Sequence, residues 1–468
     1  MPSTPATLGS LLTQMYQNKE VLQGWDAVLN LLEGAVNTFF QQQWAGLTHG
    51  AGRMSIAAVW CEGVNPAPVG GGYYTTVHCF STELGPPLFQ FQSGRAQVTV
   101  RQNILSGSLT TGTMPVPANF NPANCDCTPN DSRVSWSTPE QVNTGLNPFL
   151  SGTVPLTQVQ GLVSATTESV VLQFAQGAFA LNALSVTSVS STSIANALKN
   201  WFATNRISYC LASIDRRPLG APPGLTPRSF RFNVLQTNAG NTIVQLLIST
   251  DGPTPSSMSI NVSEPIPSAD GYTCSLMVSS RVLFQEVLSP GFNKPGGQFS
   301  LYAQPDGPTG NWAAFLSPQM HFAGSFSYGN CCNRHTDTYS IYLGLTFRGS
   351  ATNGFAISQH VHASGNAPVD IDVSGQYPVA LSGSGQGQTL TIVPGNPNVS
   401  VSGSVEDAIK SNLQGILQNN VRTSMAGVSF APVSLLALES ILFPGYLMSM
   451  RQAQVPTDLV VVGTFQPN

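Results

Sequence analysis

The sequence has few charged residues, and this shortage limits the partners that the protein can have. Asp, Glu, Lys and Arg together make up 9% of the 468 residues, whereas about 25% is typical of globular proteins. Lysine occurs only at positions 19, 199, 294 and 410, and the arginines are scattered apart from one pair at 216–217. Nucleic-acid binding depends on clustered basic side chains that neutralise phosphates. We therefore expect no nucleic-acid partner.

Long apolar runs are missing as well. No run approaches eighteen apolar residues, about the length that a membrane-spanning helix needs. The first seventeen residues lack a basic leader and a continuous apolar core, so neither a secretory signal nor a transit peptide is evident. These patterns predict a protein that is soluble in the cytoplasm at synthesis. Release without a signal peptide, and contact with a membrane, stay compatible with its uncharged polar surface.

Catalytic motifs are also missing. The sequence contains neither the G-x-S-x-G motif of hydrolases nor the G-x-x-x-x-G-K-[ST] loop of nucleotide enzymes. Asp370 and Asp372 fall on one face of a predicted strand, where a solvated surface is the favoured interpretation over acid-base chemistry. The glycines at 70–72 follow "NPAPV" and predict only a flexible turn. We expect a non-catalytic protein without a cofactor.

The histidines and cysteines do not form a standard metal-binding or disulfide pattern. His360 and His362 could share one side of a strand, and Cys331–Cys332 with His335 and Asp337 could supply zinc ligands, but the spacing fits no standard site. We expect no metal. The eight cysteines show no framework spacing, so most are expected to be free thiols. The core is expected to contain Cys61, Cys210 and Cys274, which lie in apolar stretches. A pair of loop thiols is expected at Cys125 and Cys127, because redox motifs have C-x-x-C rather than C-x-C spacing.

The residues that are present indicate a β-rich chain. It contains 44 Gly and 34 Pro, and 41% of its residues are hydrophobic, a combination typical of strands joined by many turns. Alternating patterns predict strands at 88–92, 97–101, 159–174, 207–214, 229–235, 242–250, 321–328, 338–347, 355–362, 369–373, 388–393 and 459–465. Residues 114–147 are predicted to form a long loop.

Two amphipathic segments lie near the ends of the chain. The first, residues 24–44, has apolar residues at three- and four-residue spacing and is predicted to be one long helix. The second follows acidic residues at 406–407 and extends to Val421. Shorter helices are predicted at 193–202, 278–288 and 435–443. A wide apolar stripe is not left in water, so we expect each long helix to be covered.

These elements predict an α+β architecture in which long amphipathic helices are wrapped by strongly curved antiparallel β-sheets, in an elongated molecule. A proline-rich composition break at 251–270 marks the expected boundary between lobes. We expect a flexible lead at 1–20, a first helix-plus-curved-sheet lobe at 21–265 and a second at 266–468.

Several short motifs follow one another along the chain: "GWD" at 24–26 with Val36-Asn37, "SFRFNV" at 229–234, "VSSRVLFQEVLSP" at 278–290, "VEDAI" at 405–409 and "FAPV" at 430–433. In this order they resemble the forty-seven-kilodalton and OrfX accessory proteins of botulinum neurotoxin gene clusters, which belong to the tubular lipid-binding (TULIP) superfamily. The resemblance implies curved sheets around long helices, binding of lipids or other apolar ligands, and a link to insecticidal toxin clusters. The scarcity of lysine argues against binding of a phosphoinositide headgroup, which needs a basic pocket.

The leading hypothesis is a non-catalytic lipid- or apolar-ligand-binding component of a bacterial toxin gene cluster, with other proteins of a toxin complex as further partners. The alternative is an insecticidal or pore-forming toxin acting directly on membranes through residues 153–189. A structural, capsid-like β protein fits the composition but not the two helices. The residues expected to line a hydrophobic tunnel are Val28, Leu32, Val36, Phe39, Phe40, Ile409, Leu413, Ile416, Leu417 and Val421.

Overall fold

The computed structural model describes residues 5–18, 20–94, 97–156, 160–162, 168–214, 225–250, 254–293, 297–307, 311–328, 334–364, 367–435 and 446–467. The chain divides into two compact units. Unit 1 comprises Met1–Leu32, Gln160–Glu168 and Ser213–Asn468, and unit 2 comprises Glu33–Val159 and Ser169–Ala212. The predicted lobes were contiguous in sequence, whereas these units interleave along the chain.

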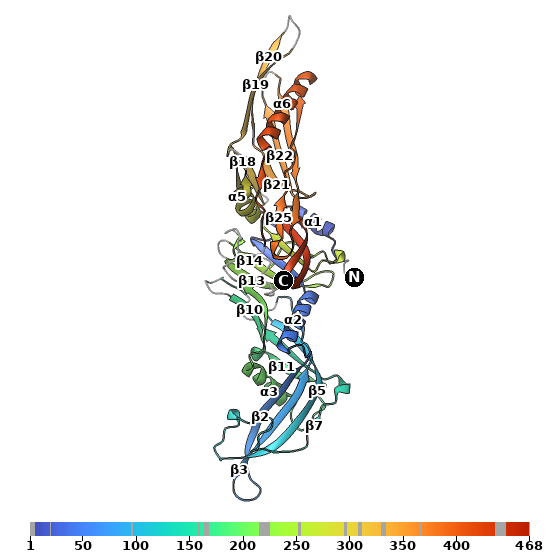
Figure 1. Cartoon of the computed structure of the whole chain (residues 1–468), viewed down its shortest axis with the longest axis vertical. Coiled ribbons are helices and arrows are strands. Elements are labelled where there is room, and N and C mark those ends of the chain that lie inside the picture. The colour runs from blue at the N-terminus through green and yellow to red at the C-terminus, as the bar shows by residue number, and fades with distance from the viewer. Residues whose placement is uncertain are drawn as a thin grey trace. The chain divides into compact units, whose positions relative to one another are not determined.

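A seven-stranded antiparallel sheet forms the core of unit 1 (Figure 1). In order across the sheet its strands are β28 (Tyr446–Gln454), β29 (Leu459–Pro467), β15 (Cys274–Val278), β1 (Ala27–Leu32), β14 (Thr242–Ser249), β13 (Ser229–Gln236) and β9 (Gln160–Leu162). Helix α1 (Leu8–Gln17) packs on this sheet through Leu11 and Met15, which are fully buried. The segment predicted to be a flexible lead therefore contains a docked helix.

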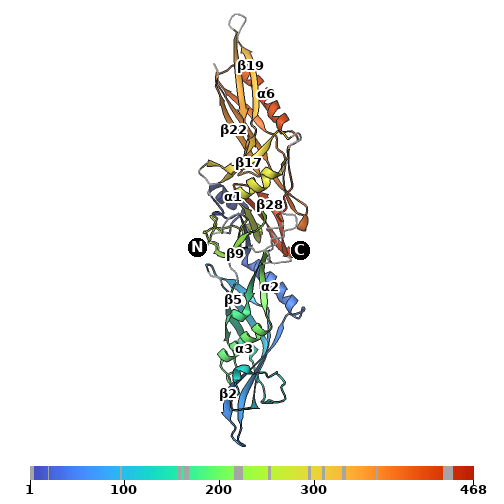
Figure 2. The same cartoon turned by 90° about the vertical axis from the view of Figure 1, so that its left-hand side faces the viewer.

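A second sheet of unit 1 has six strands in the order β17 (Ser300–Pro305), β18 (Trp312–Ser317), β21 (Thr346–Gly349), β22 (Phe355–Ala363), β23 (Val369–Tyr377) and β26 (Asn398–Gly403). Helix α6 (Asp407–Met425) lies along β26 and the hairpin of β19 (Met320–Tyr328) and β20 (His335–Leu343) (Figure 2). Two further pairs are β16 (Phe292–Asn293) with β27 (Ser429–Phe430), and β24 (Val379–Ser382) with β25 (Thr389–Ile392).

One helical segment of unit 1 follows β15 directly. It consists of α4 (Ser280–Val282), the π-helical turn η6 (Leu283–Leu288) and α5 (Ser289–Gly291). The Ser279 side chain caps it by accepting the backbone N–H of Val282 at 3.3 Å, which satisfies one of the free donors at a helix start. Short 3-10 turns lie at η5 (Ser268–Asp270) and η8 (Gly385–Gly387).

Unit 2 is built on an eight-stranded antiparallel sheet. Its main path is β11 (Ala178–Asn182), β8 (Phe149–Pro155), β5 (Gln97–Val116), β3 (Tyr73–Leu84) and β2 (Met54–Pro66), and β5 also pairs with β4 (Leu88–Phe91), β6 (Ser135–Trp136) and β7 (Glu140–Gln141). Separately, β10 (Glu168–Gln173) pairs with β12 (Ser208–Ile214). The helices are α2 (Glu33–Leu47) and α3 (Ser191–Thr204), with 3-10 turns η1 (Pro122–Asn124), η2 (Thr144–Leu146) and η3 (Phe174–Gln176).

The prediction of a single helix over 24–44 is wrong. Gly24 has φ of +88°, a value that favours glycine, and the chain then enters strand β1 before α2 begins at Glu33. Strand β1 lies between β14 and β15, and even the polar residue Asn30 is fully buried there. Its side chain donates to Ser275 Oγ at 3.1 Å and accepts from Gln245 Nε2 at 2.7 Å. In a short run of buried residues, the periodicity of apolar residues does not distinguish a strand from a helix.

The predicted architecture of long helices wrapped by strongly curved sheets is also wrong. The sheets described above are open, and the helices are short, with 10 residues in α1, 15 in α2, 14 in α3 and 19 in α6. Within the described residues, none of the helices is long and apolar enough to cross a bilayer. The predicted helices at 193–202, 278–288 and 405–421 are confirmed in place, and the one at 435–443 falls almost wholly outside the described residues.

Candidate functional site

The first predicted ligand-lining stripe is divided between the two units. Val28 belongs to β1, where it is fully buried and pairs with Leu247 and Met277 in the seven-stranded sheet, and Leu32 is half-buried at the end of that strand. Val36, Phe39 and Phe40 belong to α2 of unit 2 and are buried there. Two of the five residues therefore belong to unit 1 and three to unit 2, and their role in ligand binding stays a prediction.

The second predicted stripe lies on α6 in unit 1. Leu413, Leu417 and Val421 are fully buried and Ile409 is buried, whereas Ile416 is half-buried. This spacing of buried positions is that of a helix lying on a sheet. The structure thus explains the stripe by packing, and its role in ligand binding stays a prediction.

Aromatic rings fill the space between α2, α3 and the sheet of unit 2. The ring centroids of Phe40 and Phe89 lie 4.3 Å apart, and those of Phe40 and Tyr209 lie 5.6 Å apart. Phe174 continues the cluster, with centroids 5.4 Å from Tyr209 and 5.3 Å from Phe202 on α3. Edge-to-face and tilted contacts of this kind are typical of a close-packed core.

Two motifs of the family resemblance meet at a partly buried ion pair in unit 1. Asp26, from "GWD", accepts from Arg281 Nη2 at 2.6 Å, and Arg281 belongs to "VSSRVLFQEVLSP". The Asp26 carboxylate also accepts the Thr250 backbone N–H at 2.7 Å and its hydroxyl at 3.1 Å. Because the Asp26 side chain is only 4% exposed, these partners are required to offset its desolvation.

A small cavity of about 180 Å³ borders this ion pair. Asp458 lies in its wall and accepts the Ser280 backbone N–H at 2.6 Å, at the start of the helical segment after β15. Burial raises the pKa of Asp458 to about 6, against the lowering effect of the Ser280 hydrogen bonds. The cavity is lined by both carboxylates, Arg281, Trp25 and Trp312, among other residues.

The predicted histidine and aspartate pairs lie opposite each other on β22 and β23. His360 Nδ1 is 2.8 Å from Asp372 Oδ1, and His362 Nδ1 is 2.8 Å from Asp370 Oδ1. All four side chains are at least 41% exposed, so the solvent-facing interpretation is confirmed. The Asp372 hydrogen bond raises the pKa of His360. Cys331 and Cys332 lie outside the described residues.

The β2–β3 hairpin of unit 2 ends in an uncharged loop. It extends beyond α3 to the lower end of the view in Figure 1. Val69 in this loop is 88% exposed and Tyr73 is 43% exposed. Tyr73 pairs with Val116 at the end of β5. We call Val69, Tyr73, Tyr74 and Val116 the hairpin tip.

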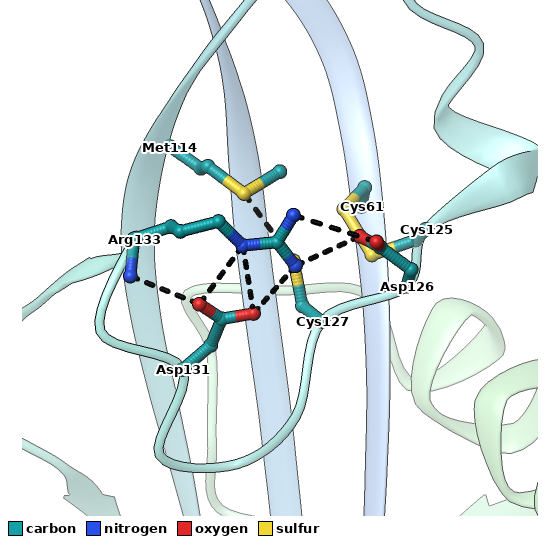
Figure 3. Close-up of polar contacts among 7 residues, drawn as sticks. All are labelled: Cys61, Met114, Cys125, Asp126, Cys127, Asp131 and Arg133. Carbon is teal, nitrogen blue, oxygen red and sulfur yellow. Dashed lines mark hydrogen bonds and ion pairs between the residues drawn. A yellow bond between two sulfur atoms is a disulfide. The ribbon is translucent and has the colours of Figure 1, made fainter.

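A cluster of sulfur atoms lies near the same end of this sheet (Figure 3). Cys61 on β2 forms a disulfide with Cys125, 64 residues later. Cys127 is free, and its Sγ lies within 4.8 Å of both bonded sulfurs and 3.5 Å from Met114 Sδ. The prediction of Cys61 as a core residue and Cys125 as a loop thiol missed this bond, because only tertiary contact brings β2 and the loop together.

Comparison with solved structures shows what the chain resembles. P47 of Clostridium botulinum A2 aligns over 95% of this chain and 98% of its own, with a TM-score of 0.53 at 11% identity. P47 of Clostridium botulinum E1 aligns over 95% of this chain and 100% of its own, with a TM-score of 0.54 at 9% identity. The fold is similar to that of the P47 proteins.

The P47-like fold confirms the family resemblance at the level of fold alone. A lipopolysaccharide binding protein also aligns over 95% of this chain and 99% of its own at 10% identity, but its TM-score of 0.33 is too low to support any inference. No family model and no curated protein sequence matches the chain.

Proposed function

We propose that the protein is a non-catalytic lipid-binding protein that attaches to lipid surfaces through the hairpin tip of unit 2. The observation that carries this proposal is the exposure of Val69 and Tyr73 in a part of the chain without charge. No Asp, Glu, Lys, Arg or His occurs from Gly63 to Val77, or from Gln102 to Cys125. These two segments contribute the hairpin tip and the end of β5 beside it.

Neutrality matters because the cost of entering a bilayer interface comes chiefly from charged groups. A buried valine side chain gains about 1.5 to 3 kcal/mol, and tyrosine favours the interface, where its ring is apolar and its hydroxyl stays hydrated. Lipid would then be held at the surface of the protein rather than in a tunnel. This agrees with the burial of every predicted lining residue except Leu32 and Ile416 among protein side chains.

The P47-like fold supports a place for this protein in a bacterial toxin gene cluster. The sequence resemblance implies that role for the family, and the alignment with the P47 proteins covers 95% of the chain. The scarcity of basic residues favours zwitterionic over anionic lipid as the partner.

Vesicle flotation tests the proposal. We expect the wild-type chain to float with phosphatidylcholine vesicles equally well at low and at high salt, since hydrophobic insertion is not screened. Val69→Asp is expected to weaken binding about tenfold or more, because about 1.4 kcal/mol corresponds to a factor of ten. The matched control is Val393→Asp, at a residue of unit 1 that is 44% exposed, and it is expected to bind as the wild type does.

Two outcomes would contradict the proposal: no flotation of the wild-type chain, or equal loss in both variants. Release of a trapped dye from the vesicles by the wild-type chain alone would instead favour the pore-forming alternative. Its suspected segment, 153–189, contributes to β8 and contains β10 and β11, and β11 pairs with β8.

A further inference from the structure

Four sulfur atoms converge at one point of unit 2. Cys61 comes from β2, Met114 from β5, and Cys125 and Cys127 from the loop that follows η1. The sulfurs of the three cysteines lie within 4.8 Å of one another, and the Met114 thioether is 3.5 Å from Cys127 Sγ. Cys61 is buried, whereas Cys125 and Cys127 are partly exposed, so a small ion can reach the cluster from solvent.

We propose that this cluster, once its disulfide is reduced, binds one Cu⁺ ion through the three cysteine thiolates and the Met114 thioether. Metal–sulfur bonds of about 2.3 Å in a tetrahedral site place the sulfurs about 3.8 Å apart. Cys127 Sγ lies within 4.8 Å of both other cysteine sulfurs and 3.5 Å from Met114 Sδ, so these separations need to change by no more than about 1 Å. The bonded sulfurs of Cys61 and Cys125 must move apart by about 1.7 Å after reduction, because a disulfide bond is only about 2.05 Å long. Thiolates bind both Cu⁺ and zinc, but the zinc ligands of proteins are Cys, His and carboxylates, so the soft thioether of Met114 favours Cu⁺.

The loop that carries Cys125 and Cys127 is held in place without the disulfide. Arg133 lies between two carboxylates (Figure 3), with Nη2 at 2.9 Å from Asp126 Oδ1 and 2.7 Å from Asp131 Oδ2. Its backbone N–H also donates to Asp131 Oδ1 at 2.9 Å. These contacts close the loop on itself, and Val134 anchors it in the small core beneath. The cysteines therefore stay close to Cys61 after reduction.

The electron and proton balance of the step is simple. A dithiol reductant gives two electrons and two protons to the Cys61–Cys125 disulfide and leaves as its own cyclic disulfide. Cu⁺ then displaces the thiol protons to solvent as it binds. Because binding releases thiol protons, it tightens as pH rises. Disulfide and metal are mutually exclusive, and each ties the loop to β2.

The test uses the full chain, reduced with dithiothreitol, desalted without oxygen and titrated with Cu⁺ against a chromophoric Cu⁺ chelator. We expect one equivalent to bind to the reduced chain and none to the oxidised chain. Loss of groups around a metal site costs 10- to 100-fold in affinity, so loss of a direct ligand in Cys127→Ser is expected to cost about 100-fold. The matched control is Cys210→Ser, which removes a free, partly buried thiol of β12 and is expected to bind as the wild type does.

Two further variants separate ligation from folding. Met114→Leu is expected to weaken Cu⁺ about tenfold while leaving the affinity for Cd²⁺, a second probe titrated in parallel, nearly unchanged. Val69→Asp is expected to bind Cu⁺ normally, so failure of the lipid proposal and failure of this one are distinguishable. Circular dichroism checks the fold of each reduced variant, and Cys127→Ala replaces Cys127→Ser if that variant unfolds. Equal Cu⁺ affinity in the wild type and the Cys127 variant, or in the oxidised and reduced chains, would overturn the proposal.

Discussion

Replacing Phe40 with alanine is expected to lower the free energy of unfolding of unit 2 by about 4 kcal/mol, within the usual range for Phe-to-Ala changes in a packed core. Phe40 is fully buried, and its ring lies against Phe89 and Tyr209 at centroid distances of 4.3 and 5.6 Å. The loss combines the transfer free energy of the ring with the cavity left among its neighbours. Urea denaturation followed by near-ultraviolet circular dichroism measures it.

The same experiment separates a packed core from a hollow lining. Leu47→Ala is the control, because Leu47 lies on the same helix but is 44% exposed, and it is expected to change stability by less than about 0.5 kcal/mol. A loss below about 1 kcal/mol for Phe40→Ala would indicate that the ring borders empty space. That result would return α2 to the list of ligand-lining elements.

Replacing Asp458 with asparagine is expected to stabilise the protein at pH 7.5 by up to about 3 kcal/mol, because each pKa unit corresponds to about 1.4 kcal/mol. Burial raises the pKa of Asp458 from 3.8 to about 6. The folded state therefore holds the proton more tightly than the unfolded state. The stabilisation that protonated Asp458 contributes to the folded state is complete below about pH 4, and it is lost as pH rises through 6.

The dependence of stability on pH distinguishes the cost of the buried Asp458 charge from a stabilisation that is the same at every pH. We expect Asp458→Asn and the wild type to unfold with similar free energies at pH 4 and to diverge by pH 7.5, as measured by urea titrations at each pH. Asp407→Asn is the control, since that side chain is 97% exposed and is expected to shift stability by less than about 1 kcal/mol at both pH values. A constant difference between Asp458→Asn and the wild type at all pH values would contradict the buried-carboxylate account.

The helix prediction succeeded where one face of a segment meets solvent and failed where neither face does. Helix α6 buries Leu413 and Leu417 and exposes Gln414 and Gly415 between them, so its 3.6-residue period is visible in the sequence. Strand β1 is paired on both sides, and even its Asn30 is buried. Polar residues in a buried strand imitate the solvent face of a helix. Because the long helix predicted over 24–44 needed a cover for its apolar face, the fold was predicted as sheets wrapped around helices.

The candidate sites depended on contacts that spacing does not encode. The cross-strand pairing of His360 with Asp372 and of His362 with Asp370 follows from the register of β22 and β23, and the Cys61–Cys125 bond from loop placement. The glycines at 70–72 were predicted only as a turn, which is correct. The turn matters because it leaves Val69 at the end of a long hairpin, and sequence alone gives no measure of that exposure.

The fluorescence of a tryptophan placed at position 69 tests most directly whether the hairpin tip enters lipid. The emission of Val69→Trp, after subtraction of the wild-type spectrum, is predicted to shift to shorter wavelength and gain intensity when phosphatidylcholine vesicles are added. Val393→Trp, treated in the same way, is predicted to remain unchanged. An unshifted spectrum for Val69→Trp under conditions where the protein floats with vesicles would show that another surface makes the contact.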